Sequence, residues 1–166
     1  MIRFFVLILM LFSWSKPNAQ TNSKAYKLML EGMYRHTVPT LSCKELKKEQ
    51  NKVVLLDTRA KREYEVSHLP EARWVGYDEF DINSVSDLPK NTPIVVYCTV
   101  GVRSEKIGEK LKAAGFQNVK NLYGSIFEWV NQGNSVVDNQ NKPTQKVHAY
   151  SKIWGVWLNK GEKVYE

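Results

Sequence analysis

The sequence predicts an α/β fold, a single domain built on a parallel sheet with helices on both faces. Short apolar runs, such as Val53–Leu56 and Ile94–Cys98, are too brief for helices and are typical of strands buried in a parallel sheet. Segments with helical periodicity separate these runs, and strands that alternate with helices at this spacing form parallel sheets. The 166 residues also suit one domain, because single cores typically span about 100–200 residues.

The expected helices and strands follow one another closely along the chain. An apolar pattern over Lys24–Arg35 predicts a helix that ends before Pro39. Ser42 and Glu45 have the spacing of a capping box, which predicts that a short helix begins at Cys43. The further expected elements are a strand over 53–56, a short helix over 60–66, a strand over 73–75, a loop or one helical turn over 81–88, a strand ending at 98 and a helix over 103–114.

Residues 1–19 have the pattern of a secretory signal peptide. Arg3 precedes an apolar stretch from Phe4 to Phe12, and a polar exit leads to the small residue Ala19. A membrane-spanning helix needs about 20 apolar residues, so this stretch is too short to cross a bilayer. We expect cleavage near Ala19 and an exported, periplasmic or secreted protein, with an uncleaved anchor as the alternative. Residues 20–39 would then form an N-terminal helical extension.

The excess of basic residues suits anionic substrates and a polyanionic surface equally. The chain has 24 Lys and Arg against 17 Asp and Glu, and loss of Arg3 and Lys16 with the signal peptide leaves 22 against 17. The basic residues are interspersed with acidic ones and no nucleic-acid reader motif appears, so we expect no nucleic-acid partner. The His and Cys residues lack the spacing of metal ligands, and we expect neither a metal nor another cofactor.

Cys98 stands where a buried strand ends and a helix begins. The N–H groups of the tight loop between them, and the free N–H groups at the helix start, point towards the sulfur. They favour a thiolate, or any anion carried on the sulfur, and Arg103 adds a positive charge. Gly101 allows the backbone to bend tightly and to approach a ligand without a Cβ. The sequence therefore predicts that Cys98 is an activated nucleophile.

These features resemble the rhodanese (sulfurtransferase) family, whose active-site loop starts with the nucleophilic Cys and runs into a helix. The resemblance extends upstream of the loop. An apolar strand that ends in Asp57, Thr58 and Arg59 is similar to the first part of the family signature. The stretch His68–Ala72 is similar to its second part, with Glu71 in place of the usual Gly.

The resemblance also extends downstream. Residues 114–116 and 119–129 are similar to the family's last strand and its Gly-Gly…Trp helix, with Ser125 in place of the second Gly. The matching stretches stand in the family's order and cover residues 40–133, which makes the assignment specific. The resemblance implies a rhodanese-like domain over these residues, followed by an extension over 134–166.

The resemblance implies a sulfurtransferase with Cys98 as its catalytic residue. The thiolate would attack the outer sulfur of thiosulfate, polysulfide or a persulfide, and the resulting persulfide would hand that sulfur to a thiophilic acceptor. The expected partners are small sulfur-containing anions or thiols, and a protein sulfur acceptor also fits. The expected binding residues are Thr99, Val100, Gly101, Val102, Arg103 and Ser104, and the expected supporting residues are Asp57 and Arg59.

Two residues have two open roles each. Arg103 either binds an anionic donor or braces the loop through a carboxylate. Arg59 either pairs with Asp57 or faces the mouth of the site. Apart from Arg103 the loop supplies no charge, whereas some thiosulfate-using members of the family have additional basic residues there. This loop is accordingly less suited to thiosulfate than theirs.

Other functions are compatible with a Cys loop. A non-catalytic or sulfur-carrier module that binds a partner is one, although the presence of Cys98 argues for catalysis. A Cys-dependent phosphatase is another, but its Arg stands one residue farther from the Cys, because the loop wraps a phosphoryl group. Here Arg103 follows Cys98 by five residues. The lack of a Cys-x-x-Cys motif argues against thiol–disulfide exchange.

The remaining candidates are Cys43, His68 and the C-terminal extension. We interpret Cys43 as a small semi-buried residue, with a role as resolving partner for Cys98 as the alternative. We interpret His68 as a turn or supporting residue, because persulfide chemistry needs no proton shuttle. Residues 134–166 are rich in aromatics and Lys, and we expect them to pack on the domain, with a partner or membrane surface as the alternative.

Overall fold

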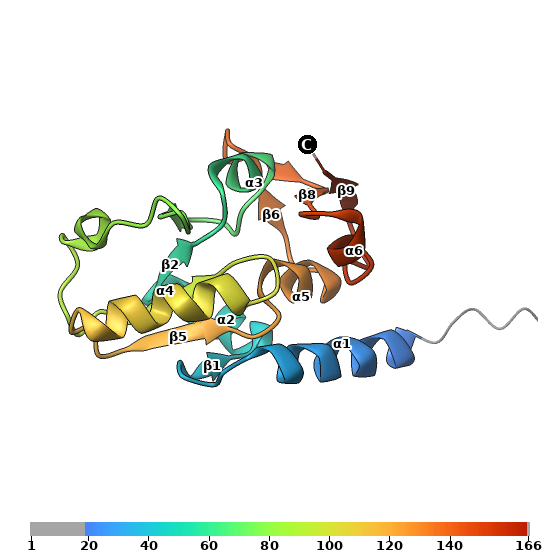
Figure 1. Cartoon of the computed structure of the whole chain (residues 1–166). Helices are drawn as coiled ribbons and strands as arrows, with labels where there is room; N and C mark the ends of the chain where they lie inside the picture. The colour runs from blue at the N-terminus through green and yellow to red at the C-terminus, as the bar shows by residue number, and fades with distance from the viewer. Residues whose placement is uncertain (1–18, 166) are drawn as a thin grey trace, which may run out of the picture.

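A five-stranded parallel sheet forms the centre of the fold, which a computed structural model describes over residues 19–165 (Figure 1). The strand order is β1-β5-β4-β2-β3, and every neighbouring pair runs parallel. The predicted parallel α/β fold is therefore confirmed. The strands are β1 Thr40–Leu41, β2 Val54–Asp57, β3 Arg73–Trp74, β4 Ile94–Tyr97 and β5 Val119–Leu122.

Helices α2, α3 and α4 begin within one residue of the positions that the sequence predicts, whereas α1 begins at Ala19, five residues before the predicted Lys24. The helix at Cys43 has the expected capping box: Glu45 N–H donates to Ser42 Oγ at 3.2 Å, and Ser42 N–H donates to Glu45 Oε2 at 2.9 Å. This arrangement satisfies two backbone donors that would otherwise stay unpaired. The helices are α1 Ala19–Met33, α2 Cys43–Glu49, α3 Lys61–Val66, α4 Val102–Ala113 and α5 Ser125–Asn131, with 3₁₀ turns η1 Gln50–Lys52 and η2 Ile82–Val85.

Alternate residues of the central strands enter two separate cores, one on each face of the sheet. Leu55 of β2 and Val95 of β4 pack with apolar residues of α1, α2 and α5. Leu56 and Val96, their neighbours in sequence, pack instead with residues of α4 and η2. Successive side chains of a strand point to opposite faces, so a strand that is covered on both sides is a continuous apolar run. This is the pattern from which the strands were predicted.

The N-terminal helix α1 packs against the first of these cores. Tyr26, Leu30 and Tyr34 are buried there. Tyr26 Oη donates to the carbonyl of Gly124 at 3.0 Å, which ties α1 to the start of α5. The predicted signal peptide lies outside the described residues, except for Ala19, the first residue of α1. Within residues 19–165, no helix has both the length and the apolar character that a membrane crossing requires.

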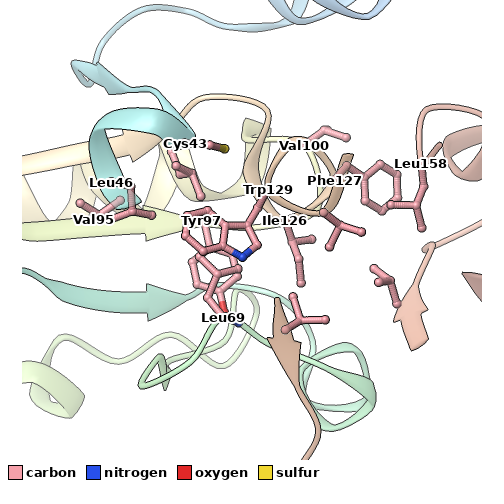
Figure 2. Packing of buried hydrophobic residues seen from close by; sticks show 14 of the residues in the cluster. Cys43, Leu46, Leu69, Val95, Tyr97, Val100, Ile126, Phe127, Trp129 and Leu158 are labelled. Atoms are coloured by element: carbon pink, nitrogen blue, oxygen red, sulfur yellow. The ribbon is translucent and has the colours of Figure 1, made fainter. Parts of the chain in front are cut away.

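The C-terminal segment folds back onto the same core. Val147 and Leu158 are buried in it, and Leu158 shares this cluster with Phe127 of α5 (Figure 2). The Trp157 ring stacks on Tyr26 of α1, with ring centroids 5.5 Å apart. These contacts place the segment beside α1 and α5, close to the carboxyl end of the sheet.

The same segment contains short elements that the sequence pattern did not predict. They form two small sheets, of which β6–β7 is antiparallel and β8–β9 is parallel, and β8 lies beside α3 (Figure 1). Strands of two or three residues are too short to show an alternating pattern. The elements are β6 Val136–Val137, β7 Pro143–Thr144, β8 Lys146–His148, α6 Lys152–Gly155 and β9 Glu162–Val164.

Two departures from the family pattern keep a backbone conformation that favours glycine. Glu71 has φ 64° and Ser125 has φ 51°, both in the left-handed region. Residues other than Gly, Asn and Asp adopt this region at a cost of roughly 1–2 kcal/mol. Both positions therefore have the backbone conformation to which a Gly is best suited, and at Ser125 the hydroxyl makes contacts in the site described next.

Candidate active site

Cys98 lies directly after β4, at the carboxyl end of the sheet, and is almost completely buried. Its backbone is fixed by the start of α5: Cys98 N–H donates to Ser125 Oγ at 3.1 Å, and the Cys98 carbonyl accepts from Ile126 N–H at 3.2 Å. The carbonyl of Thr99 accepts from Phe127 N–H, also at 3.2 Å. The start of the loop is therefore held by a helix that the sequence places about 27 residues away.

Gly101 points its backbone N–H at the sulfur. The distance from Gly101 N to Cys98 Sγ is 3.1 Å. Gly101 has φ 113°, and a Cβ on it would overlap the hydroxyl of Tyr34. That hydroxyl is itself fixed, because it donates to the Val100 carbonyl at 2.5 Å and accepts from Gly124 N–H at 3.0 Å. Both the dihedral angle and the space at this position require glycine.

The surroundings of Cys98 lower its pKa below the ordinary value of 9.0. Burial raises this pKa, but the charge of Arg103 and hydrogen bonds from Ser104 and Gly101 lower it by more. The Ser104 hydroxyl donates to Asn121 Oδ1 at 2.7 Å, so the geometry assigns the direct hydrogen bond on the sulfur to Gly101 N–H. A thiolate is the nucleophilic form of cysteine, and this site favours it.

Arg103 forms a bidentate ion pair with Glu63 of α3. The distance from Nη1 to Oε2 is 2.7 Å and that from Nη2 to Oε1 is 2.8 Å. Nη2 also donates to Thr99 Oγ1 at 2.8 Å, and Thr99 Oγ1 donates to Glu63 Oε1 at 3.1 Å. The sequence left two roles open for Arg103. In the structure it has the role of a brace, because it connects the loop to α3. Contact of Arg103 with a substrate stays a prediction.

Glu63 contributes acid-sensitive stability. Burial raises its pKa, but the hydrogen bonds and charge of Arg103 outweigh this and bring the pKa from 4.5 to about 2. A depressed carboxyl pKa stabilises the fold fully above pH 4.5, and this contribution is lost as the pH falls towards 2. We expect Glu63→Gln to remove on the order of 3 kcal/mol of this pH dependence. Urea unfolding between pH 7 and pH 2 measures the loss.

The control for this measurement is Glu65→Gln, on the exposed side of the same helix. Glu65 makes no such contact with Arg103, so its substitution should leave the acid limb of the stability curve close to wild type. Equal acid limbs for Glu63→Gln and wild type would contradict the assigned ion pair.

Asp57 and Arg59 form a second ion pair, which is completely buried. Arg59 Nη2 lies 2.7 Å from Asp57 Oδ2 and 2.6 Å from the Ser67 carbonyl. This pairing links the end of β2 to the turn after α3. Because Arg59 has no exposed surface, it does not face the mouth of the site. His68 is also buried, and its Nδ1 lies 3.0 Å from the Tyr64 carbonyl.

A pocket of about 170 Å³ opens over Cys98. Its floor is the predicted loop, from which Thr99, Val100, Val102 and Arg103 contribute side chains. Gly101 contributes its N–H to the sulfur instead, and Ser104 is buried against Asn121. The walls come from outside the predicted site: they are Met33 of α1, Tyr150 and Trp154.

Cys43 does not line this pocket. It is almost completely buried, and burial raises its pKa to about 12. Its Sγ lies 3.9 Å from the Tyr123 carbonyl, and both Cys43 and Cys98 are free thiols. A buried cysteine without a thiolate behaves as a small apolar residue, which argues against a role as resolving partner.

Several residues of the site were missed by sequence reasoning. Glu63 and Tyr34 stand far from the loop in sequence, and nothing in their local pattern indicates their partners. Asn121 lies inside strand β5 between Lys120 and Leu122, and a polar residue buried in a strand must be hydrogen-bonded, so its presence there was a signal. Ser125 was a signal too, because it replaces a Gly of the family pattern. Asn121 Nδ2 donates to the Gly101 carbonyl at 2.9 Å.

Comparison with known proteins identifies relatives of this loop and sheet. A family model for the rhodanese-like domain matches residues 42–132. The chain is 32% identical over 78 residues to the adenylyltransferase and sulfurtransferase Uba4 of Ogataea parapolymorpha, a match over 47% of this chain and 20% of that protein. It is 33% identical over 102 residues to the tRNA uridine(34) hydroxylase of Protochlamydia amoebophila, over 57% of this chain and 32% of that protein.

The chain spans about a third or less of the length of these two relatives. Among solved structures, the thiosulfate sulfurtransferase of Pseudomonas aeruginosa superposes with a TM-score of 0.57 at 22% identity. This match covers 82% of the present chain and 26% of the Pseudomonas protein. At this level of identity the likeness shows a shared fold.

Proposed function

The chain belongs to the rhodanese-like domain family, and on this premise we propose that it is a sulfurtransferase that carries a sulfane sulfur on Cys98. The observation that supports this most directly is the 3.1 Å contact between Gly101 N–H and Cys98 Sγ. A buried thiol would normally be neutral, but here the net effect of its surroundings is a lowered pKa. The site is built to hold negative charge on sulfur.

Transfer proceeds in two steps through a covalent intermediate. The Cys98 thiolate attacks the outer sulfur of a donor, for example thiosulfate; a new S–S bond forms, the donor's S–S bond breaks, and sulfite leaves with the electron pair. The thiolate of an acceptor then attacks the outer sulfur of the persulfide, and the Cys98 thiolate is the leaving group. Splitting the exchange in this way replaces one difficult step by two easier ones.

The loop contributes electrostatic stabilisation to both steps. The N–H of Gly101 is already in place before the reaction, so it costs no reorganisation when charge develops on sulfur. Neither step needs a proton shuttle once the thiol is ionised, which agrees with the position of His68 against the Tyr64 carbonyl. The Glu63–Arg103 pair keeps the loop in the geometry that this stabilisation requires.

The test is the intact mass of the purified protein after incubation with sulfane-sulfur donors and without reductant. With thiosulfate or inorganic polysulfide in excess, we expect an adduct of one sulfur, ~32 Da, that peptide mapping places on Cys98. Cyanide should remove it as thiocyanate. Protein that stays unmodified with every donor would favour a non-catalytic binding module, and a phosphoryl adduct formed from an aryl phosphate would favour a phosphatase.

We also propose that the protein is exported. The support is the pattern of Arg3, the apolar stretch Phe4–Phe12 and the small residue Ala19. N-terminal sequencing of the natural protein should then start near Gln20. A chain that starts at Met1 in a cytosolic fraction would contradict this proposal.

A further inference from the structure

The pocket over Cys98 is walled by residues that lie outside the matched domain. Met33 belongs to the N-terminal helix, and Tyr150 and Trp154 belong to the C-terminal segment. With Val100 and Val102 from the loop, they give the pocket a mainly apolar lining. A cavity of about 150 Å³ with apolar walls holds benzene in another protein, so the 170 Å³ pocket has room for a ring of that size.

The aromatic wall is held in place by contacts on both sides. Tyr150 N–H donates to Nδ1 of the buried His148 at 3.1 Å, and its ring lies 5.1 Å from the Arg103 guanidinium carbon. Trp154 lies on α6, which is followed by the buried Leu158. The wall is therefore part of the folded structure rather than a free tail, although Tyr150 keeps 46% of its surface exposed to solvent.

The pocket offers little free charge to a substrate. Of its lining residues in the described part of the chain, Arg103 is the one cation, and the Cys98 thiolate is the nucleophile itself. The Arg103 guanidinium is already bound by the Glu63 carboxylate and by Thr99 Oγ1. The pKa of Glu63, lowered to about 2, keeps that carboxylate ionised, so the pair as a whole is close to neutral.

We propose that this site takes its sulfur from carriers in which the sulfur that leaves with the rest of the donor bears an apolar alkyl or aryl group. Met33, Tyr150 and Trp154 are the residues that determine this preference. The inference rests on the proposed sulfurtransferase function and specifies its substrate class. For a persulfide carrier RSSH, the Cys98 thiolate attacks the outer sulfur and forms a new S–S bond with it, the S–S bond of the carrier breaks, and RS⁻ leaves with the electron pair while Cys98 becomes a persulfide.

The physical reason is the fate of the group that leaves. Sulfite, the leaving group of thiosulfate, is a strongly hydrated dianion, and it would have to lie against apolar and aromatic side chains. Removing such an ion from water without a compensating partner is costly. An alkyl or aryl group in the same place gains roughly 25 cal/mol for each Å² of apolar surface that it buries.

The test compares three donors: benzenethiosulfonate, methanethiosulfonate and thiosulfate. The first two are monoanions that release a sulfinate, so they differ mainly in the apolar group. We expect kcat/KM to be higher for benzenethiosulfonate than for methanethiosulfonate by about tenfold or more, and lowest for thiosulfate. The rates of the same donors with a small free thiol provide the correction for intrinsic reactivity.

Substitutions test whether Tyr150 and Trp154 cause the preference for donors with an apolar group. Trp154→Ala and Tyr150→Ala should each lower kcat/KM more for benzenethiosulfonate than for methanethiosulfonate, so that the ratio of the two values falls several-fold. The matched control is Ile153→Ala, because Ile153 neighbours Trp154 on α6 but is 79% exposed and does not line the pocket. Its ratio should equal that of wild type. Melting temperatures of all variants report whether the fold is kept.

The outcomes separate this inference from the proposed function. If every donor forms a persulfide on Cys98 but wild-type kcat/KM is equal for benzenethiosulfonate and methanethiosulfonate, the proposed substrate class is wrong. The proposed sulfurtransferase function would still stand. A high ratio that Trp154→Ala and Tyr150→Ala leave unchanged would overturn the role of the wall. If no donor modifies Cys98, the proposed function fails and the inference fails with it.

Discussion

Cys98→Ser should reduce sulfur transfer by roughly 10⁴-fold or more, to the uncatalysed background, because the covalent intermediate can no longer form. A serine hydroxyl has the shape of the thiol but does not ionise near neutral pH. It can still accept the hydrogen bond that Gly101 N–H donates to the sulfur, so the loop should keep its conformation. The measurements are kcat/KM with the best donor, the one-sulfur mass adduct, and the melting temperature.

The matched control is Cys43→Ser, the only other cysteine of the chain. Cys43 is buried in an apolar core with a raised pKa, so its substitution should lower stability while the one-sulfur adduct still forms. This pair of variants separates loss of a nucleophile from loss of folding. Persistent transfer by Cys98→Ser, or loss of the adduct in Cys43→Ser, would contradict the assignment of Cys98 as sulfur carrier.

The sequence predicted the parts of the fold that depend on local pattern. The continuous apolar run over Ile94–Tyr97 reflects burial on both faces of the sheet, and the Ser42–Glu45 spacing reflects a contact within a single helical turn. The place of Cys98 followed from the same logic, because the end of a strand and the start of a helix meet there. Such features depend on neighbours in sequence.

The missed parts of the site depend on contacts between distant segments. Tyr34 meets the loop across 66 residues and Glu63 meets Arg103 across 40. A single sequence contains no local sign of such pairs, since a Glu in the first turn of a helix looks the same whether it is exposed or paired. The walls of the pocket were missed for a related reason. Aromatic residues in 134–166 indicate burial somewhere, but their pattern does not say against which surface.

Gly101→Ala should be the most damaging substitution in the loop that leaves the nucleophile in place. A residue with a Cβ is strained at φ 113°, and the new Cβ would overlap the Tyr34 hydroxyl, which two hydrogen bonds hold in position. Backbone strain and overpacking together should cost roughly 2–5 kcal/mol of unfolding free energy. The shifted loop should also move the Gly101 N–H away from the Cys98 sulfur, and we therefore expect a loss of about 10²–10³ in kcat.

Gly115→Ala is the control that isolates the steric contribution. Gly115 also has positive φ, at 93°, but a Cβ at this position would lie 3.9 Å from its nearest neighbouring atom. Its substitution should therefore cost only the backbone strain, about 1–2 kcal/mol, and should leave sulfur transfer unchanged. Urea unfolding of the two variants gives the difference directly. Equal losses would mean that the Tyr34 hydroxyl does not restrict the loop.

A double-mutant cycle with Tyr34→Phe extends the same test to the contact itself. Phe lacks the hydroxyl oxygen that a Cβ on Gly101 would meet first. Alone, Tyr34→Phe should cost about 1–3 kcal/mol, because it leaves the Val100 carbonyl and Gly124 N–H without their partner. In the double variant the shortest contact is removed, while the ring carbons Cζ and Cε1 that Phe keeps still lie 2.6 and 2.9 Å from the new Cβ. The overlap is thus smaller but not abolished, and the combined loss should be smaller than the sum of the single losses. Strictly additive losses would show that Tyr34 and Gly101 act independently. The contact with Tyr34 would then have no part in directing the Gly101 N–H at the Cys98 sulfur.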